Sequence, residues 1–221
     1  MIRFENVYKR YPNGRDALAS VSFRLERGEM AFLTGPSGAG KSTLLKLIAL
    51  IERPSRGTVL IGKRNTSKVP RRRIPEFRRR LGIVFQDHKL LNDRTVFDNI
   101  ALPLVIGALR RREIGRRVRA ALDQVGLLGF EKHLPEALSS GEQQRVGIAR
   151  AIASRPELVI ADEPTGNLDP DLSREIFGLF ERFNEVGVTV LVATHDLGVI
   201  AERDYRHIRL ADGKLAAAEP S

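Results

Sequence analysis

The 221-residue chain has no cysteine and no tryptophan, and aromatic residues make up only 6% of it. Without cysteine it can hold neither a disulfide framework nor a thiolate metal site, which is compatible with a reducing compartment such as the cytoplasm. No apolar stretch reaches the roughly 20 residues that span a bilayer, because Lys46, Pro103 and Gly107 interrupt the longest candidates. The first six residues also lack the apolar core of a secretory signal. We therefore expect a soluble globular protein without a membrane span.

Positive charge is the unusual feature of the composition, with 37 Lys and Arg against 27 Asp and Glu and a formal net charge of +10. Arginines concentrate in two segments, 71–80 and 110–119. Such clusters form solvated helix faces, or they attract the anionic inner leaflet of a membrane or nucleic acid, since both carry a dense negative field. The clusters have little of the aromatic interleaving that a base-stacking surface requires. Nucleic acid is therefore the least favoured of these three interpretations.

The most specific motif is a glycine-rich run between an apolar segment, residues 30–33, and an amphipathic one, residues 44–48. It reads Gly35-Pro36-Ser37-Gly38-Ala39-Gly40-Lys41-Ser42-Thr43. This is the phosphate-loop pattern G-x-x-x-x-G-K-[ST] in the strand–loop–helix context that it requires. Glycines let backbone N–H groups surround a polyphosphate, and the helix N-terminus adds a positive dipole end. Lys41 can then reach the β- and γ-phosphates, and Ser42 offers a hydroxyl to Mg²⁺.

Short apolar runs alternate with helical patterns through much of the chain, which predicts an α/β fold. Runs typical of buried strands occupy residues 30–33, 81–85, 158–163 and 187–194. Residues 2–32 combine strand-like runs with a Pro-Asn-Gly turn signal, so we expect a small antiparallel sheet beside the phosphate loop. Leucine and alanine at helical spacing predict a mostly helical section over residues 87–155. A turn-rich loop at residues 164–169, an amphipathic helix at 172–184 and a terminal hairpin around Asp212-Gly213 complete the chain.

Polar side chains follow three of the apolar runs. Gln86 ends one run, Asp162 and Glu163 end a second, and His195 follows the last. Ligands of α/β folds bind at the carboxyl ends of the strands, so we expect these residues to converge on one crevice. There one carboxylate can hold Mg²⁺ while the other orients or deprotonates an attacking water. Gln86, considered singly, is equally well explained as an ordinary polar residue at a strand end, and a single histidine such as His195 is more often structural than catalytic.

Two further features of the sequence each allow two interpretations. Ser139 and Glu142 have the capping-box spacing S-x-x-E at a helix start, where free N–H groups can equally hold an anion. The cap is the safer interpretation from spacing alone. Tyr11 either packs at a strand end or faces a nucleotide, and its spacing does not decide between the two.

These motifs in this order resemble the ATP-binding subunits of ATP-binding-cassette (ABC) systems over essentially the whole chain. By this resemblance residues 35–43 form the Walker A loop, and residues 138–143, which include Ser139, Ser140, Gly141 and Glu142, form the signature motif. Tyr11 would stack on adenine, and Gln86 would touch Mg²⁺ and sense a membrane partner. Asp162 and Glu163 would be the Walker B pair, Leu168-Asp169 the D-loop, and His195 the switch histidine at the γ-phosphate. ATP and Mg²⁺ are the implied cofactors.

The same resemblance implies an ABC-type nucleotide-binding domain with a RecA-like core, a small antiparallel β subdomain and a helical subdomain. All 221 residues would form this single domain. Residues 1–86 and 156–221 would supply the core and the β subdomain, and residues 87–155 the helical subdomain. In the family two cassettes close head to tail, so that the signature of one completes the ATP site of the other. One cassette per chain therefore implies a homodimer.

One residue departs from the family pattern, since Ser140 stands where the first glycine of Leu-Ser-Gly-Gly is expected. A serine Cβ restricts backbone approach and penalises positive φ, so we expect altered closure around the γ-phosphate with ATP binding and hydrolysis retained.

Four segments, at residues 30–35, 84–88, 93–99 and 184–190, resemble the cell-division branch of the family in particular. That resemblance implies an integral membrane partner, indirect control of cell-wall hydrolases, and a peripheral position on the cytoplasmic face of the plasma membrane at the division site. Two alternatives stay open. The subunit could drive lipoprotein release or export, or it could be a soluble ABC protein that acts on nucleic acid.

Overall fold

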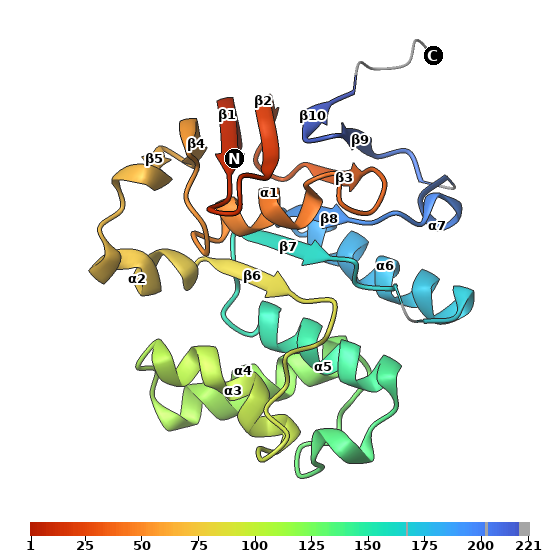
Figure 1. The fold of residues 1–221 in the computed structure, drawn as a ribbon. Coiled ribbons are helices and arrows are strands. Elements are labelled where there is room, and N and C mark those ends of the chain that lie inside the picture. The colour runs from red at the N-terminus through yellow and green to blue at the C-terminus, as the bar shows by residue number, and fades with distance from the viewer. Residues whose placement is uncertain (167, 202, 217–221) are drawn as a thin grey trace.

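The phosphate-loop strand lies inside a six-stranded sheet, next to a second sheet of four strands (Figure 1). The computed structural model describes residues 1–166, 168–201 and 203–216; Asn167, in the predicted turn-rich loop, lies outside them. In chain order the elements are β1 (Ile2–Arg10), β2 (Asp16–Leu25), β3 (Met30–Thr34), α1 (Lys41–Ile48), β4 (Arg56–Ile61), β5 (Arg64–Asn65), α2 (Ile74–Arg78), β6 (Leu81–Val84), α3 (Val96–Ile106), α4 (Arg111–Gln124), α5 (Ser140–Ile152), β7 (Leu158–Asp162), α6 (Pro170–Glu185), β8 (Thr189–Ala193), α7 (Leu197–Ala201), β9 (Arg206–Ala211) and β10 (Lys214–Leu215).

The six-stranded sheet has the order β10-β9-β3-β8-β7-β6, and all its pairings are parallel except that of β10 with β9. Register places Leu33 of β3 opposite Ala193 of β8, and Ala193 opposite Asp162 of β7. Val84 of β6 lies opposite Ala161. The carboxyl ends of these four strands are therefore level, and the residues that follow them meet at one edge.

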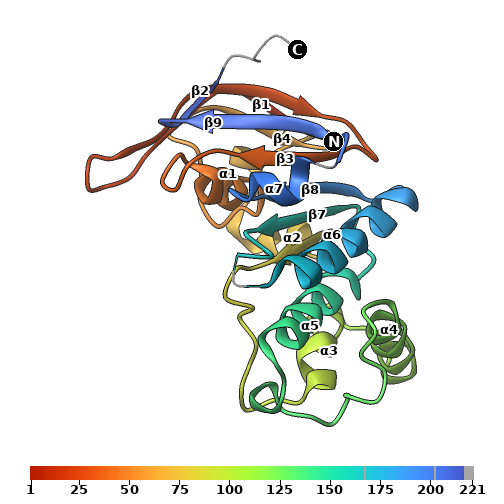
Figure 2. The same ribbon diagram turned by 90° about the vertical axis from the view of Figure 1, so that its right-hand side faces the viewer.

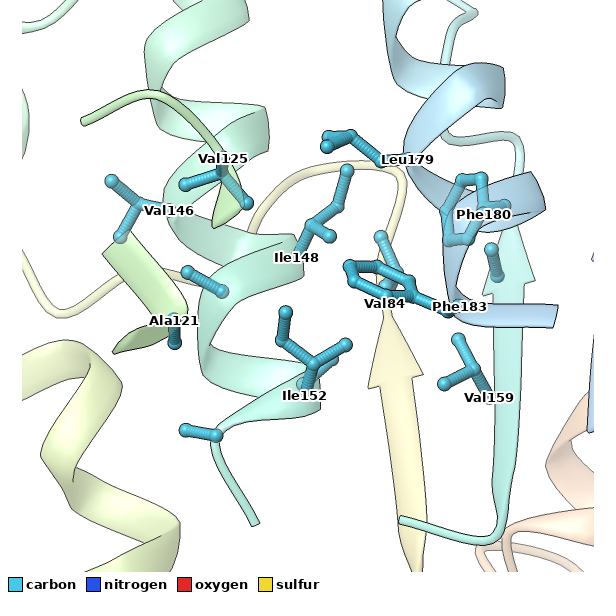
Figure 3. Close-up of a cluster of buried hydrophobic side chains, with 14 of the residues drawn as sticks. Val84, Ala121, Val125, Val146, Ile148, Ile152, Val159, Leu179, Phe180 and Phe183 are labelled. Carbon is cyan, nitrogen blue, oxygen red and sulfur yellow. The ribbon is translucent and has the colours of Figure 1, made fainter. Parts of the chain in front are cut away.

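Successive residues of the central strands face two separate hydrophobic cores. Phe32 of β3 packs in one core and Leu33 in the other, as the period-two geometry of a strand requires. The first core lies under α5 and α6, where Ile148, Ile152 and Phe180 pack near Val84 and Val159 (Figure 3). The second core is closed by α1 and the four-stranded sheet. Both faces of the parallel strands are covered, which explains their continuous apolar sequences.

The predicted antiparallel sheet is confirmed, with strand order β2-β1-β4-β5. The helices expected within residues 87–155 are α3, α4 and α5, which pack on one another at the end of the molecule opposite that sheet (Figure 2). Across the described residues, we find no helix with the length and apolarity that crossing a membrane requires.

Phe180 gives a direct test of the core between α6 and the sheet, because its side chain is fully buried and edge-on to Phe177. Replacing Phe180 with alanine leaves a cavity, and we expect it to lower the free energy of unfolding by about 3–5 kcal/mol. Val186→Ala is the control, since Val186 is 79% exposed, and it should change stability by less than about 0.5 kcal/mol. Urea unfolding followed by circular dichroism measures both; equal effects of the two variants would contradict this packing.

Candidate nucleotide site

A cleft of about 330 Å³ opens at the carboxyl edge of the parallel strands. Its wall combines the phosphate loop, the first strands and the strand ends, through Tyr11, Arg15, Ala17, Ser37, Gly38, Gly40, Lys41, Ser42, Thr43, Gln86, Glu163 and His195. The predicted convergence of Gln86, Glu163 and His195 on one crevice is thus confirmed.

Helix α1 begins at a glycine that leaves the helix end open. Gly40 is the N-cap residue, has φ of +108° and makes no side-chain cap bond to the helix. A Cβ at this position would lie 2.6 Å from the Ala17 carbonyl oxygen, so only glycine fits there. The first N–H groups of a helix have no partner within the helix, and together with the dipole they favour an anion. This geometry fits the predicted role of the loop in holding phosphate.

The Lys41 ammonium is held beneath this loop. Its Nζ donates to the Gly35 carbonyl oxygen at 2.7 Å and to the Pro36 carbonyl oxygen at 3.3 Å, and lies 3.3 Å from Oε1 of Glu163. The side chains of Lys41 and Glu163 are only 7% and 11% exposed. An ammonium has three N–H donors; two of them serve the loop carbonyl oxygens, and Glu163 is the ion-pair partner of the ammonium. A γ-phosphate that reaches Nζ would compete with these oxygens for the ammonium.

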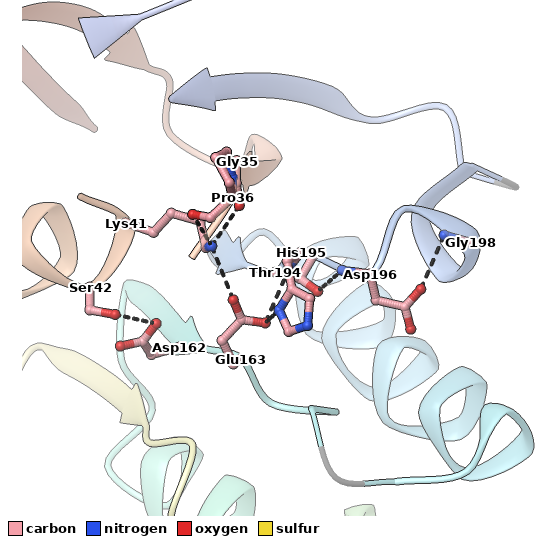
Figure 4. A network of polar contacts seen from close by, with 10 residues as sticks. All are labelled: Gly35, Pro36, Lys41, Ser42, Asp162, Glu163, Thr194, His195, Asp196 and Gly198. Atoms are coloured by element: carbon pink, nitrogen blue, oxygen red, sulfur yellow. Dashed lines mark hydrogen bonds and ion pairs between the residues drawn. The ribbon is translucent and has the colours of Figure 1, made fainter. Parts of the chain in front are cut away.

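Glu163 connects Lys41 to His195 (Figure 4). Its Oε2 accepts from His195 Nδ1 at 2.8 Å and from the His195 backbone N–H at 3.2 Å. Its own N–H donates to the Ala193 carbonyl oxygen on β8 at 2.9 Å. Glu163 has φ of +48°, a strained conformation for a residue with a Cβ, of the kind that concentrates at functional sites. The backbone of β8 thus fixes the carboxylate at the end of β7.

Asp162 faces the other side of the same strand end. Ser42 Oγ donates to Asp162 Oδ1 at 3.1 Å, and burial raises the pKa of the Asp162 carboxyl above its usual value despite that hydrogen bond. A half-buried carboxylate beside a hydroxyl suits Mg²⁺, which takes oxygen ligands and retains several waters. No group of three or more His, Cys, Asp or Glu among the described residues could hold a metal. The ion would therefore depend on these two oxygens, on Gln86 in the same cleft, and on phosphate and water.

Tyr11 lies at the rim of the cleft. Its hydroxyl is 3.3 Å from Thr43 Oγ1, and the Lys9 ammonium lies 5.0 Å from the centre of its ring. The hydrogen bond connects the ring to helix α1, so Tyr11 is fixed against the phosphate loop. Gln86 also lines the cleft. Its side-chain amide nitrogen, Nε2, lies near Gly166, 3.8 Å from where a Cβ on that glycine would stand.

The signature residues do not line this cleft. Ser139 is the N-cap of α5, and both bonds of the predicted capping box are present: the Glu142 N–H donates to Ser139 Oγ at 3.3 Å, and the Ser139 N–H to Glu142 Oε2 at 2.8 Å. Asp169 likewise caps α6, where its Oδ1 accepts from the Leu172 N–H at 2.9 Å. A Cβ on Gly141 would lie 2.2 Å from Leu172 Cδ2, so a larger residue there would require the Leu172 side chain on α6 to move.

The expected φ penalty at Ser140 is wrong. Ser140 is the first residue of α5 and is absent from the described residues with positive φ, because the first turn of a helix requires right-handed dihedral angles. The serine backbone is therefore unstrained. Only the added Cβ and hydroxyl remain as a difference from glycine.

Arg15 was missed by the sequence analysis. Its Nη2 donates to the Gly38 carbonyl oxygen at 3.1 Å, which places a guanidinium over the phosphate loop. Its position four residues after Tyr11 was the only available signal, and an isolated arginine after a turn has no distinguishing pattern.

A phosphate loop, a Walker B pair and a polar residue at the next strand end define a P-loop nucleotide hydrolase. The family model "ABC transporter" matches residues 18–166. The chain is 58% identical over 215 residues to the cell division ATP-binding protein FtsE of Escherichia coli K12, covering 97% of each. It is 44% identical over 220 residues to FtsE of Mycobacterium tuberculosis, covering 99% of this chain and 96% of that protein.

Solved ABC cassettes have the same fold. The dimeric structure of MJ0796, a bacterial ABC transporter cassette, superposes with a TM-score of 0.90 at 38% identity, covering 98% of this chain and 97% of that one. A post-hydrolysis dimer of MJ0796 bound to ADP and Pi matches equally well, at 37% identity. The chain belongs to the ABC ATPase family and, within it, to the FtsE group of cell division ATP-binding proteins.

Asp162→Asn separates metal binding from folding. A raised carboxyl pKa means that the folded state favours the protonated acid, so this group's contribution to stability is largest at low pH and is lost as the pH rises through the raised pKa. At neutral pH the amide removes that cost and still accepts from Ser42. We expect the nucleotide-free variant to melt at or above the wild-type temperature, and to lose the additional stabilisation that Mg²⁺ gives with ATP.

Thermal unfolding in four conditions tests this expectation: without ligand, with ATP and EDTA, with ATP and Mg²⁺, and with Mg²⁺ alone. Nucleotide at about 100 times its Kd stabilises the wild type by about 2.7 kcal/mol. If Mg²⁺ with ATP stabilised Asp162→Asn as strongly as the wild type, Asp162 would have no role at the metal.

Proposed function

We propose that the chain is the ATP-hydrolysing subunit of a membrane complex of the FtsE–FtsX type, in which ATP-driven closure of two copies controls peptidoglycan hydrolases during cell division. The observation that carries the catalytic part is the contact of Glu163 with both Lys41 and His195 at the phosphate loop. The FtsE similarity carries the biological part. The subunit would lie peripherally on the cytoplasmic face of the plasma membrane, at the division site.

Each predicted residue has a role in the bound state. Tyr11 stacks on the base, and the loop N–H groups hold the phosphates together with Lys41. Ser42, Gln86 and Asp162 would hold Mg²⁺, which would neutralise charge at the phosphates. Glu163 gives up its ion pair with Lys41, orients the attacking water and accepts the proton of that water. His195 stabilises the negative charge on the γ-phosphoryl group. His195 is already positioned by its two contacts to Glu163.

The second copy would complete the site. Ser139, Ser140, Gly141 and Glu142 lie outside the cleft of their own chain, yet they start a helix whose N-terminus favours an anion. Head-to-tail pairing would bring them, with Asp169, to the nucleotide of the other chain. MJ0796 is dimeric in its solved structure, which supports a homodimer here.

The motion of dimer closure would be transmitted to the membrane partner through the segment that follows Gln86. His88 and Lys89 have positive φ, and Arg150 on α5 donates to the carbonyl oxygens of both. Asn99 on α3 holds the same segment by donating to the Leu91 carbonyl oxygen at 3.0 Å and accepting from its N–H at 2.8 Å. Because α5 begins at the signature motif, a movement of that helix on closure is passed directly to this segment.

Glu163→Gln tests the catalytic assignment. The amide keeps the shape of the side chain but is no base for water, so we expect hydrolysis to fall on the order of 100-fold or more while the affinity for ATP is retained. Phosphate release and binding of a fluorescent ATP analogue measure the two quantities. A variant that hydrolyses ATP at the wild-type rate would remove Glu163 from this role.

Ser140→Gly tests the departure from the family pattern. Removing the Cβ and hydroxyl lets the signature helix approach phosphate more closely, and we expect turnover to rise by about fivefold, which corresponds to a barrier lower by ~1 kcal/mol. Purified wild type and variant are assayed side by side at saturating ATP. If the variant hydrolysed ATP at the wild-type rate or more slowly, Ser140 would have no steric effect on turnover.

The identity of the partner distinguishes the proposed function from its alternatives. Tagged Glu163→Gln is purified with ATP from detergent-solubilised cells, and the proteins that co-purify are identified. A small integral membrane protein with a large extracytoplasmic loop is the expected result. A lipoprotein-releasing or exporting permease would instead assign the chain to transport, and ribosomes or nucleic acid without a membrane protein would contradict the membrane complex.

A further inference from the structure

The corner between α3 and α4 combines exposed apolar side chains with a cluster of arginines. Val105 and Ile106, at the end of α3, are 58% and 60% exposed, and Leu102 one turn earlier is 38% exposed. These positions are three and four residues apart and so share one side of the helix. The chain then turns, and Arg110, Arg111 and Arg112 follow within six residues of Ile106, all exposed. Apolar and cationic groups are thus adjacent on the surface.

The arginines continue along the outer side of α4. Arg112, Arg116 and Arg119 recur at the i, i+4, i+7 spacing of one helix face, and all three are exposed. The opposite face, with Ile114 and Val118, is buried in the core that α3 and α5 share. The fold therefore fixes which way the guanidinium groups point.

Most of these charges have no ion-pair partner among the residues that the structure describes. Residues 105–119 contain six arginines and one glutamate. Glu113 pairs with Arg117 at 2.6 Å, and within the ranges that the structure describes no other ion pair involves an arginine of this segment. Five guanidinium groups of this segment, which begins at the exposed apolar residues, therefore have no carboxylate ion-pair partner among the described residues.

We propose that this apolar-basic corner, formed by Val105, Ile106, Arg110, Arg111, Arg112 and Arg116, binds an anionic lipid surface directly. The guanidinium fork matches phosphate oxygens in pairs, and apolar side chains between cations enter the boundary between headgroups and acyl chains. A nucleic acid would satisfy the arginines but would leave Val105 and Ile106 in water. The apolar part is therefore the feature that selects lipid.

The position of the corner is compatible with this contact. Both views show α3 and α4 in the part of the molecule that lies away from β1 and β2 (Figures 1 and 2). The inference goes beyond the proposed function, because the chain itself, without its membrane partner, would recognise the leaflet. Vesicle binding and ATP hydrolysis are measured separately, so either can fail without the other.

Co-sedimentation of the full chain with vesicles tests the inference. We expect binding at physiological ionic strength to vesicles of phosphatidylglycerol and phosphatidylcholine in equal parts, and little binding to phosphatidylcholine alone. Arg110→Ala, Arg111→Ala and Arg112→Ala combined should weaken it on the order of 100-fold, at about fivefold for each cation near an anionic surface. Val105→Ser with Ile106→Ser should weaken vesicle binding while leaving binding to a DNA duplex unchanged.

The chain supplies a matched control in its other arginine cluster. Residues 71–80 also contain six arginines and one glutamate, but no large apolar side chain of that segment is among the exposed ones. Arg71→Ala, Arg72→Ala and Arg73→Ala combined remove the same charge and should change vesicle affinity by less than about fivefold. Unchanged ATPase rates and melting temperatures show that all the variants are folded.

Three results would overturn the inference. The first is no binding of the wild type to anionic vesicles. The second is equal weakening by the two triple variants, which would indicate a general effect of net charge. The third is vesicle binding that does not change in the Val105→Ser, Ile106→Ser double variant. That result would mean that the corner is a cationic surface that binds DNA as readily as lipid.

Discussion

The Lys41 ammonium is the group on which the site depends. It is buried under the phosphate loop, and a buried cation is stable only when it is paired and hydrogen-bonded. Here two loop carbonyl oxygens and Glu163 satisfy it, and Glu163 in turn accepts from His195. A phosphate that enters the loop competes for the same ammonium. In the proposed mechanism, nucleotide binding and release of the Glu163 carboxylate would therefore be coupled through one cation.

Parallel strands of level register make this coupling possible. Leu33, Ala193 and Asp162 lie opposite one another, so the loop after β3 and the polar residues after β7 and β8 meet within a few ångströms. The two hydrophobic cores hold the strands from both faces, and the strained φ of Glu163 is maintained by the hydrogen bond of its N–H to β8. Rigid strands thus position groups that must later exchange partners.

The sequence predicted the strands, the phosphate loop and the convergence of Gln86, Glu163 and His195, because apolar runs and the position after a run are local signals. It did not predict the contact of Lys41 with Glu163, which joins residues far apart in the chain and depends on side-chain rotamers and strand register. It missed Arg15 for the same reason. The penalty expected at Ser140 was wrong although the sequence already indicated a helix start there: Ser140 is the first residue of α5, whose φ is negative, so a Cβ causes no backbone strain.

The central claim is that one chain holds only half of each catalytic site and that ATP brings two chains together. Sedimentation equilibrium of the Glu163→Gln variant, with saturating ATP and Mg²⁺ and again with ADP, tests it most directly. The account predicts a dimer that retains two nucleotides with ATP and a monomer with ADP. A variant that stays monomeric while it is saturated with ATP would contradict the account, because the signature motif would then have no nucleotide to contact.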